Sequence, residues 1–290
     1  MRLQHRYVFA YASLVCGLTV TLTSAVSAQS RTEQTPDAVQ LSAAADPAAG
    51  QVQAPRPIPA PVPVERPYWS STAGFEADTH DTAYSFFGPS YHKPFRPNMQ
   101  FVAGASVNYL HYAYDNGAGG VTEVRSPGLS TKAGVRIGNK NWVQLTAGPG
   151  FKRRHVQVRG AGDSLLSSSR NIEVGVSLGA DVWANPSRLD NVHGMLHYGA
   201  EDGYTWSRLG YKHQITNHDW RGRFSHYLGA EFIGQGNEDI TSYQVGPFVE
   251  FLHAPSSVSL MVRGGYKRST FNTGPDKTGP WLALSFYKKL

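Results

Sequence analysis

Cysteine is almost absent from this chain: the one thiol, Cys16, lies in the first apolar segment. That segment begins with two basic residues, continues with an apolar run over residues 7–26 and ends at Val26-Ser27-Ala28. This order is typical of a secretory signal peptide, so residues 1–28 are predicted to be removed by cleavage after Ala28. The mature chain is therefore expected to contain no thiol, no disulfide and no cysteine nucleophile.

Long apolar runs and concentrated charge are also lacking. Beyond the signal, no window approaches the ~18 apolar residues that a spanning helix needs, which excludes helical membrane spans. The formal charge of +6 falls to +4 without Arg2 and Arg6, and the basic residues are scattered along the chain. In an exported protein this argues against nucleic-acid binding. It favours basic side chains beside anionic headgroups, with outer-membrane lipid as a partner.

Proline is concentrated in one stretch, residues 54–67, where it alternates with other residues. Residues 29–49 before it are rich in Ala, Ser, Gln and Asp. A proline tract of this kind favours an extended polyproline II conformation of roughly 3 Å per residue. We predict that residues 29–67 form a disordered periplasmic tether, with a docking ligand for a periplasmic partner as the alternative.

Residues 68–290 repeat one pattern about a dozen times: segments of about ten residues with apolar side chains at every second position, divided by Gly, Asn, Asp and Pro. The clearest segment is 172–183, where apolar residues occupy every even position from Ile172 to Val182. In an amphipathic helix the apolar residues recur every three or four positions, so an alternation at every second position favours strands. The strands are predicted at residues 68–78, 82–92, 100–114, 128–137, 142–152, 172–183, 192–201, 204–213, 224–234, 240–252, 257–267 and 280–287.

A closed barrel is the sheet that pairs every backbone amide inside lipid. The pattern therefore predicts an all-β fold, a transmembrane antiparallel β-barrel of about twelve strands over residues 68–290. If the apolar face meets lipid, the other face lines the lumen, and glycine is frequent there. The charged residues predicted to line the lumen are Lys132, Arg136, Glu173, Asp181, Arg208, Glu231, Glu250 and Arg263. They either pair across a small barrel or line a polar channel.

Aromatic residues gather near the ends of the predicted strands. Trp206 and Tyr211 are candidates for stacking on a sugar, and the alternative is an interface girdle at headgroup depth. Catalytic and metal signatures are missing: no HExxH spacing occurs, and Ser225 and His226, as neighbours on a strand, point to opposite faces. We therefore predict no catalytic residue, no metal site, no cofactor and no enzyme activity.

Three segments resemble a known family. Residues 176–186 read VSLGADVWANP, residues 196–213 read LHYGAEDGYTWSRLGYKH, and residues 226–251 read HYLGAEFIGQGNEDITSYQVGPFVEF. In this order they resemble the BcsS family, barrel-like proteins associated with bacterial cellulose synthase genes. Residues 74–88 and 109–116 are similar to the family's opening elements, and the resemblance covers residues 68–290.

The resemblance implies a non-enzymatic outer-membrane barrel that is accessory to the synthesis or export of cellulose or a related exopolysaccharide. Its partners would be the cellulose synthase or export machinery, or the glucan chain itself. The family brings no established catalytic residues. Two other functions stay open at this point: a small general porin and an outer-membrane lipid hydrolase.

Overall fold

The structure, a computed structural model, describes residues 66–116, 119–216, 224–272 and 274–290. The signal peptide and nearly all of the tether lie outside these residues, so both stay predictions. The described residues form twelve strands: β1 (Tyr68–Asp78), β2 (Ala83–Arg96), β3 (Met99–Asp115), β4 (Val121–Gly138), β5 (Trp142–Arg159), β6 (Leu165–Ala184), β7 (Asp190–Gly199), β8 (Tyr204–Thr216), β9 (Phe224–Gly236), β10 (Ile240–His253), β11 (Val258–Phe271) and β12 (Lys277–Lys289).

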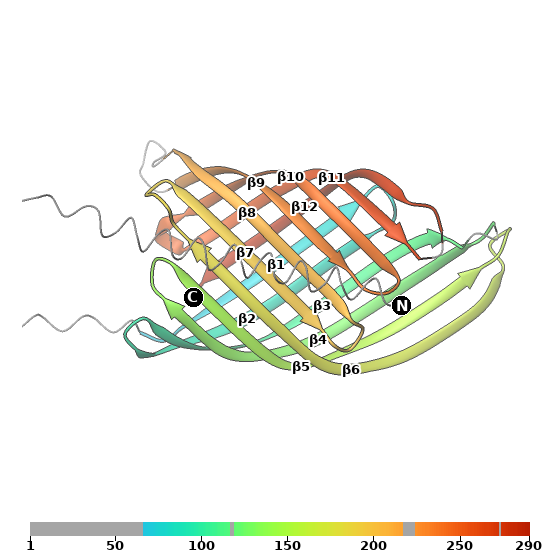
Figure 1. Cartoon of the computed structure of the whole chain (residues 1–290), viewed down its shortest axis with the longest axis horizontal. Helices are drawn as coiled ribbons and strands as arrows, with labels where there is room; N and C mark the ends of the chain where they lie inside the picture. The colour runs from blue at the N-terminus through green and yellow to red at the C-terminus, as the bar shows by residue number, and fades with distance from the viewer. Residues whose placement is uncertain (1–65, 117–118, 217–223, 273) are drawn as a thin grey trace, which may run out of the picture.

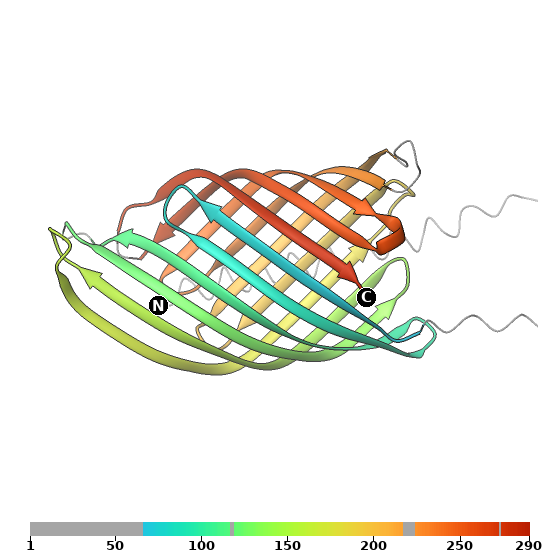
Figure 2. The same cartoon turned by 180° about the vertical axis from the view of Figure 1, so that it is seen from behind.

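Every strand pairs antiparallel with its neighbours in sequence, and β1 pairs with β12 to close the barrel. The strands are strongly tilted, and the end of β12 lies beside the start of β1 (Figures 1 and 2). At this junction the Leu290 amide donates a hydrogen bond of 2.8 Å to the Trp69 carbonyl. The predicted fold class, a twelve-stranded transmembrane-type barrel, is confirmed.

The outer surface of the barrel is apolar, as the alternating sequence pattern predicts. Large apolar side chains project outward on strands all around the wall, among them Leu145 (59% exposed), Val245 (58%) and Leu282 (58%). A continuous apolar belt of this kind is too large for contact with water and is the surface of a barrel that sits in lipid. Among the described residues, no helix is long and apolar enough to cross a membrane.

Tight turns connect the strands where the sequence supplies residues that tolerate a left-handed backbone. Asp81 (φ 59°), Asn98 (φ 63°) and Asp163 (φ 64°) hold such conformations in three of the connections. Asp and Asn adopt this region more readily than other non-glycine residues because their side chains bond locally. The only helical element among the described residues is the 3₁₀ turn η1 (Ala254–Ser256) between β10 and β11.

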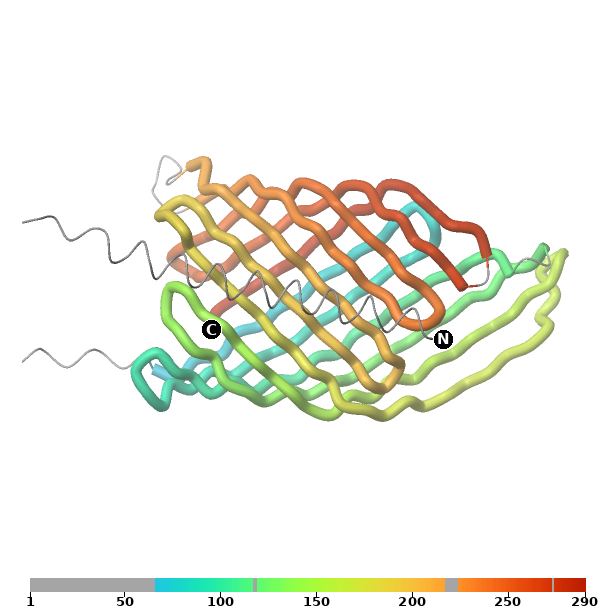
Figure 3. Tube along the Cα trace, in the orientation of Figure 1, coloured from blue at the N-terminus to red at the C-terminus, as the bar shows by residue number. Residues whose placement is uncertain are grey.

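One side of the barrel extends beyond the rest. Strand β6 pairs with β7 only over Ser177–Ala184, although it begins at Leu165 and pairs with β5 along nearly its full length. Residues 149–176 therefore form a hairpin that continues past the turn between β7 and β8, and we call it the projecting hairpin. In Figures 1 and 3 the tips of β5 and β6 reach past the turn between β7 and β8, at the end of the barrel opposite the start of β1 and the end of β12, which we call the far rim.

The projecting hairpin corrects the predicted strand bounds. β4 begins at Val121 instead of residue 128, β5 ends at Arg159 instead of 152, and β6 begins at Leu165 instead of 172. The added residues leave the apolar belt, so neither lipid nor lumen imposes alternation on their side chains, although backbone pairing continues. β7 ends at Gly199, two residues before the predicted end, because Ala200–Gly203 form the turn to β8.

Candidate functional site

The interior of the barrel is the candidate site, because polar side chains are buried there in number. Among the described residues, charged side chains that are at least nine-tenths shielded from solvent include Glu76, Lys212, Glu231, Glu250, Arg263 and Lys267. Each of them has an exposed apolar residue beside it on its strand. Burying a charge is costly unless it is paired and hydrogen-bonded, so the contacts of these groups decide what the interior can do.

Glu231 on β9 lies at the centre of the largest interior ion-pair group. Its carboxylate lies 2.6 Å from the Arg208 guanidinium on β8 and 3.4 Å from that of Arg263 on β11. The Glu231 side chain has no solvent exposure, and Arg263 also donates a 3.0 Å hydrogen bond to the Ser285 hydroxyl. One carboxylate thus compensates two buried guanidinium groups from strands on both sides of it.

A second group lies toward the rim where β1 begins and β12 ends. Lys212 on β8 donates a hydrogen bond of 2.5 Å to the Glu250 carboxylate on β10. The Ser259 hydroxyl on β11 donates to the other oxygen of that carboxylate at 2.6 Å. Lys212 also lies over the Trp183 and Tyr227 rings, 4.9 and 4.5 Å from their centroids. Both carboxylate oxygens and the ammonium are therefore satisfied within the barrel.

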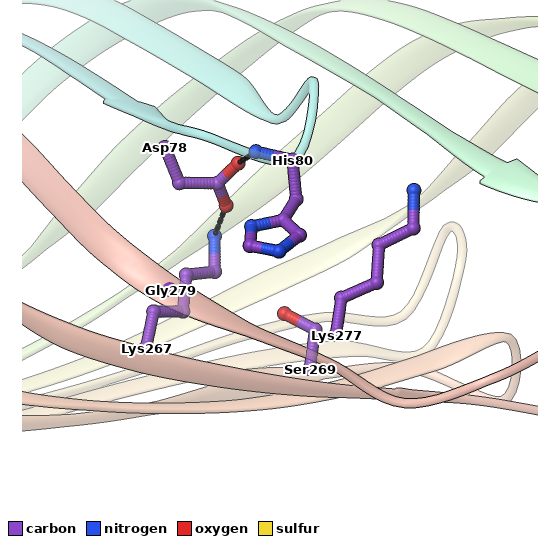
Figure 4. A pocket seen from close by; sticks show the side chains of 6 residues that line it. All are labelled: Asp78, His80, Lys267, Ser269, Lys277 and Gly279. Atoms are coloured by element: carbon purple, nitrogen blue, oxygen red, sulfur yellow. Dashed lines mark hydrogen bonds and ion pairs between the residues drawn. The ribbon is translucent and has the colours of Figure 1, made fainter.

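A third group joins β1 to β11 and β10. The Lys267 ammonium lies 2.9 Å from Asp78 and 3.8 Å from Glu76, and Gln244 donates a 2.6 Å hydrogen bond to Glu76. Figure 4 shows Lys267 directed at Asp78, whose carboxylate also accepts a bond from the His80 backbone. The space around this pair has essentially no volume free for even a water molecule (≈ 0 Å³), so it has no room for a small-molecule ligand.

The ion-pair groups join strands up to three places apart around the barrel, on the side formed by β8–β12 and β1. The contacts link β8 with β10, β9 with β11 and β1 with β10 and β11, none of which are neighbours in the sheet. Near the far rim, Tyr112 and Val124 of β3 and β4 pack against Ile240 and Phe271 of β10 and β11 in one apolar cluster. Trp206 of β8 likewise packs against the cluster that contains Trp281 of β12, so side chains from distant parts of the wall meet inside the barrel.

The eight residues predicted to line the lumen all lie on the inner side of the wall. Arg208, Glu231, Glu250 and Arg263 belong to the ion-pair groups described above. Arg136 donates two hydrogen bonds to Gln144, at 2.8 and 3.1 Å, and Gln144 donates to Asp181 at 2.9 Å. The remaining two are less enclosed: the Lys132 stem covers Gly104, and Glu173 lies on the projecting hairpin.

Trp206 and Tyr211 do not form one stacking surface. Trp206 points inward and packs against the buried cluster of Ile233 and Trp281. Tyr211 points outward with 48% exposure, and its hydroxyl donates a 2.5 Å hydrogen bond to Asp190. The two residues are an odd number of positions apart on β8, which places them on opposite faces of the wall.

Sequence analysis missed several interior residues that complete the ion-pair groups: Glu76, Asp78, Gln144, Lys212, Gln244 and Lys267. A signal for two of them was present. Lys212 and Lys267 each lie four residues after a predicted inward arginine, Arg208 or Arg263, so continued alternation along β8 and β11 places them on the same face.

The described residues contain no group of three or more His, Cys, Asp or Glu side chains arranged to hold a metal ion. Ser225 and His226 lie on opposite faces of β9. His226 contacts Thr216 and Phe251, whereas Glu231, five residues further along β9 and on the opposite face, is engaged by two arginines. The interior thus offers paired charges that stabilise the barrel. One buried hydroxyl, that of Ser70, lies 3.1 Å from the His92 ring, whose other nitrogen has no hydrogen-bond partner among the described residues.

A closed antiparallel barrel with an apolar outer belt and a polar, internally paired interior defines a β-barrel of the outer-membrane type. The chain belongs to the BcsS family: the family model described as cellulose biosynthesis protein BcsS matches residues 98–289. The resemblance found in the sequence is therefore confirmed. No curated protein matches the chain.

Three solved structures are similar in overall arrangement. The β-domain of the Bordetella autotransporter BrkA has a TM-score of 0.46 at 11% identity, covering 77% of this chain and 98% of that one. LpxR from Salmonella typhimurium has a TM-score of 0.43 at 10% identity, covering 76% and 99%. The transport unit of the autotransporter AIDA-I from Escherichia coli has a TM-score of 0.39 at 11% identity, covering 78% and 90%.

Proposed function

We propose that this protein is a non-enzymatic accessory of bacterial cellulose production that is exported through a cleaved signal peptide and seated in the outer membrane. Membership of the BcsS family supports the link to cellulose. The apolar belt supports a place in a membrane, and a closed barrel after a signal peptide is the form in which exported strands enter the outer membrane.

Contacts between distant strands inside the barrel are the observation that supports a mode of action. A conduit for glucan, or a general porin, needs a continuous water-filled passage, whereas side chains of β3 and β4 pack against those of β10 and β11 inside this barrel. The function therefore rests on the rims and the outer surface of the barrel, which contact the synthesis or export machinery or the glucan. The predicted periplasmic tether, residues 29–67, would extend that reach by about 3 Å per residue.

Deletion of the coding region is expected to lower the amount of extracellular, cellulase-digestible glucan, because an accessory protein limits how much polymer is made or released. The measurement compares the deletion strain, its parent and a strain complemented with the full-length chain, under conditions in which the parent makes glucan. Restoration by the complementing chain is the control for effects on neighbouring genes. Unchanged glucan in the deletion strain would contradict the proposed function.

A further inference from the structure

The outer face of the far rim carries a cross-strand row of basic side chains. His111 on β3 pairs with Arg125 on β4, Arg125 pairs with His155 on β5, and His155 pairs with Arg170 on β6, so four basic residues lie side by side on one face. Arg153 lies one outward position closer to the apolar belt, opposite Ile172. We call these five residues the basic row.

The basic row is not neutralised by the protein. Glu123 accepts bonds from His111 at 3.0 Å and from Arg125 at 2.6 Å. Within the described part of the chain, no carboxylate lies within ion-pair distance of Arg153 or Arg170, and both side chains are exposed. Like charges directly opposite one another destabilise a sheet. Three arginines against one glutamate therefore leave an excess of positive charge that calls for an external anion.

The position of the row identifies that anion. On the same outward face, the residues next to it toward the middle of the barrel are apolar and exposed: Tyr109, Phe151, Ile172 and Val174. The row therefore lies where the apolar belt ends, at the depth of the lipid headgroups. Arginine forks bind phosphate oxygens in pairs, and basic residues at this depth are attracted to anionic headgroups.

We propose that the basic row is a binding site for the phosphate of lipid headgroups in the leaflet at the far rim. A lipid bound there has its acyl chains against Ile172 and Val174 and its phosphate between Arg125, Arg153 and Arg170. The bound lipid supplies the negative charge that the projecting hairpin lacks and fixes the hairpin at the membrane surface. This assignment does not depend on the role in cellulose production.

The test uses the full-length chain, purified in a non-ionic detergent and titrated with phosphatidic acid or with phosphatidylcholine of the same acyl chains. Native mass spectrometry counts the lipid retained. The wild-type chain is expected to retain phosphatidic acid in preference. The triple variant Arg125→Gln/Arg153→Gln/Arg170→Gln is expected to bind it about tenfold more weakly or worse, since each basic residue near a headgroup contributes measurably. Replacement of the same three residues by lysine is expected to restore most of the binding.

A matched control removes three exposed basic residues at the opposite rim, Lys93→Gln/Arg96→Gln/Lys140→Gln. It changes the net charge equally and is expected to leave the retention of phosphatidic acid nearly unchanged. Equal loss in both triple variants, or no loss in the first, would overturn the proposal. Complete displacement of the lipid by millimolar inorganic phosphate would overturn it as a lipid site. The single variant Arg170→Gln gives the same comparison should the triple variant fail to fold.

Discussion

Replacing Glu231 with alanine is expected to lower the free energy of unfolding by about 3–5 kcal/mol, because it leaves two buried guanidinium groups without a counter-charge. Arg208 and Arg263 approach Glu231 from β8 and β11, and neither is free to reach water. The loss is measured as the shift of the midpoint, in urea or on heating, at which the detergent-solubilised chain changes from folded to unfolded migration on a gel.

Two variants distinguish the loss of this buried counter-charge from the loss of a carboxylate elsewhere in the protein. Glu231→Gln keeps a hydrogen-bond acceptor of the same size, so it is expected to lose less than the alanine variant. Glu123→Ala removes a carboxylate that also contacts two basic residues, but on the outer face, where exposed pairs contribute about 0–1 kcal/mol. Equal shifts for Glu231→Ala and Glu123→Ala would mean that the interior ion pairs do not hold the barrel together.

Replacing Leu178 with arginine is expected to lower the free energy of unfolding by about 2–4 kcal/mol, because it places a charge on the lipid face near the middle of the membrane. Leu178 points outward from β6, near the centre of the apolar segment from Ile172 to Val182, and is 49% exposed. The measurement is the same unfolding midpoint, made on chains reconstituted in lipid vesicles. The physical cause is the loss of hydration of the guanidinium in the hydrocarbon.

The same strand supplies the control for this prediction. Leu166 lies on the same face of β6 and is 64% exposed, but it belongs to the projecting hairpin. Leu166→Arg is expected to change the free energy of unfolding by no more than about 0.5 kcal/mol, as at an ordinary surface position. If both variants lost the same stability, the apolar belt would not mark the membrane-spanning part of the wall.

The strand order and the two faces of the wall could be predicted from sequence because two solvents act on every strand. Lipid selects Ile172, Val174 and Leu178 on one side of β6, while the interior accepts Gly175 and Asp181 on the other. Apolar and polar residues alternate in the sequence wherever a strand has lipid on one face and the polar interior on the other. The same reasoning explains why the tip of the projecting hairpin, residues 153–171, was not predicted as strand: outside the membrane both faces meet water, and this selection ends.

The pairing of the interior charges could not be predicted from sequence. Which residues meet depends on the register of strands two or three places apart around the barrel, as for Glu76 with Gln244 or Glu231 with Arg263. Alternation places each charge on the inner face but does not give its height relative to a distant strand. A polar lumen face in sequence is therefore compatible with both a channel and a filled barrel, and the contacts decide between them.

The central claim is that this barrel is filled by its own side chains and acts through its surface. The most direct test is the electrical conductance of planar lipid bilayers into which the purified full-length chain has inserted. We expect no sustained channel, because side chains of β3 and β4 meet those of β10 and β11 inside the barrel. A steady, ohmic conductance for the folded wild-type chain would contradict it and would establish the protein as a small porin.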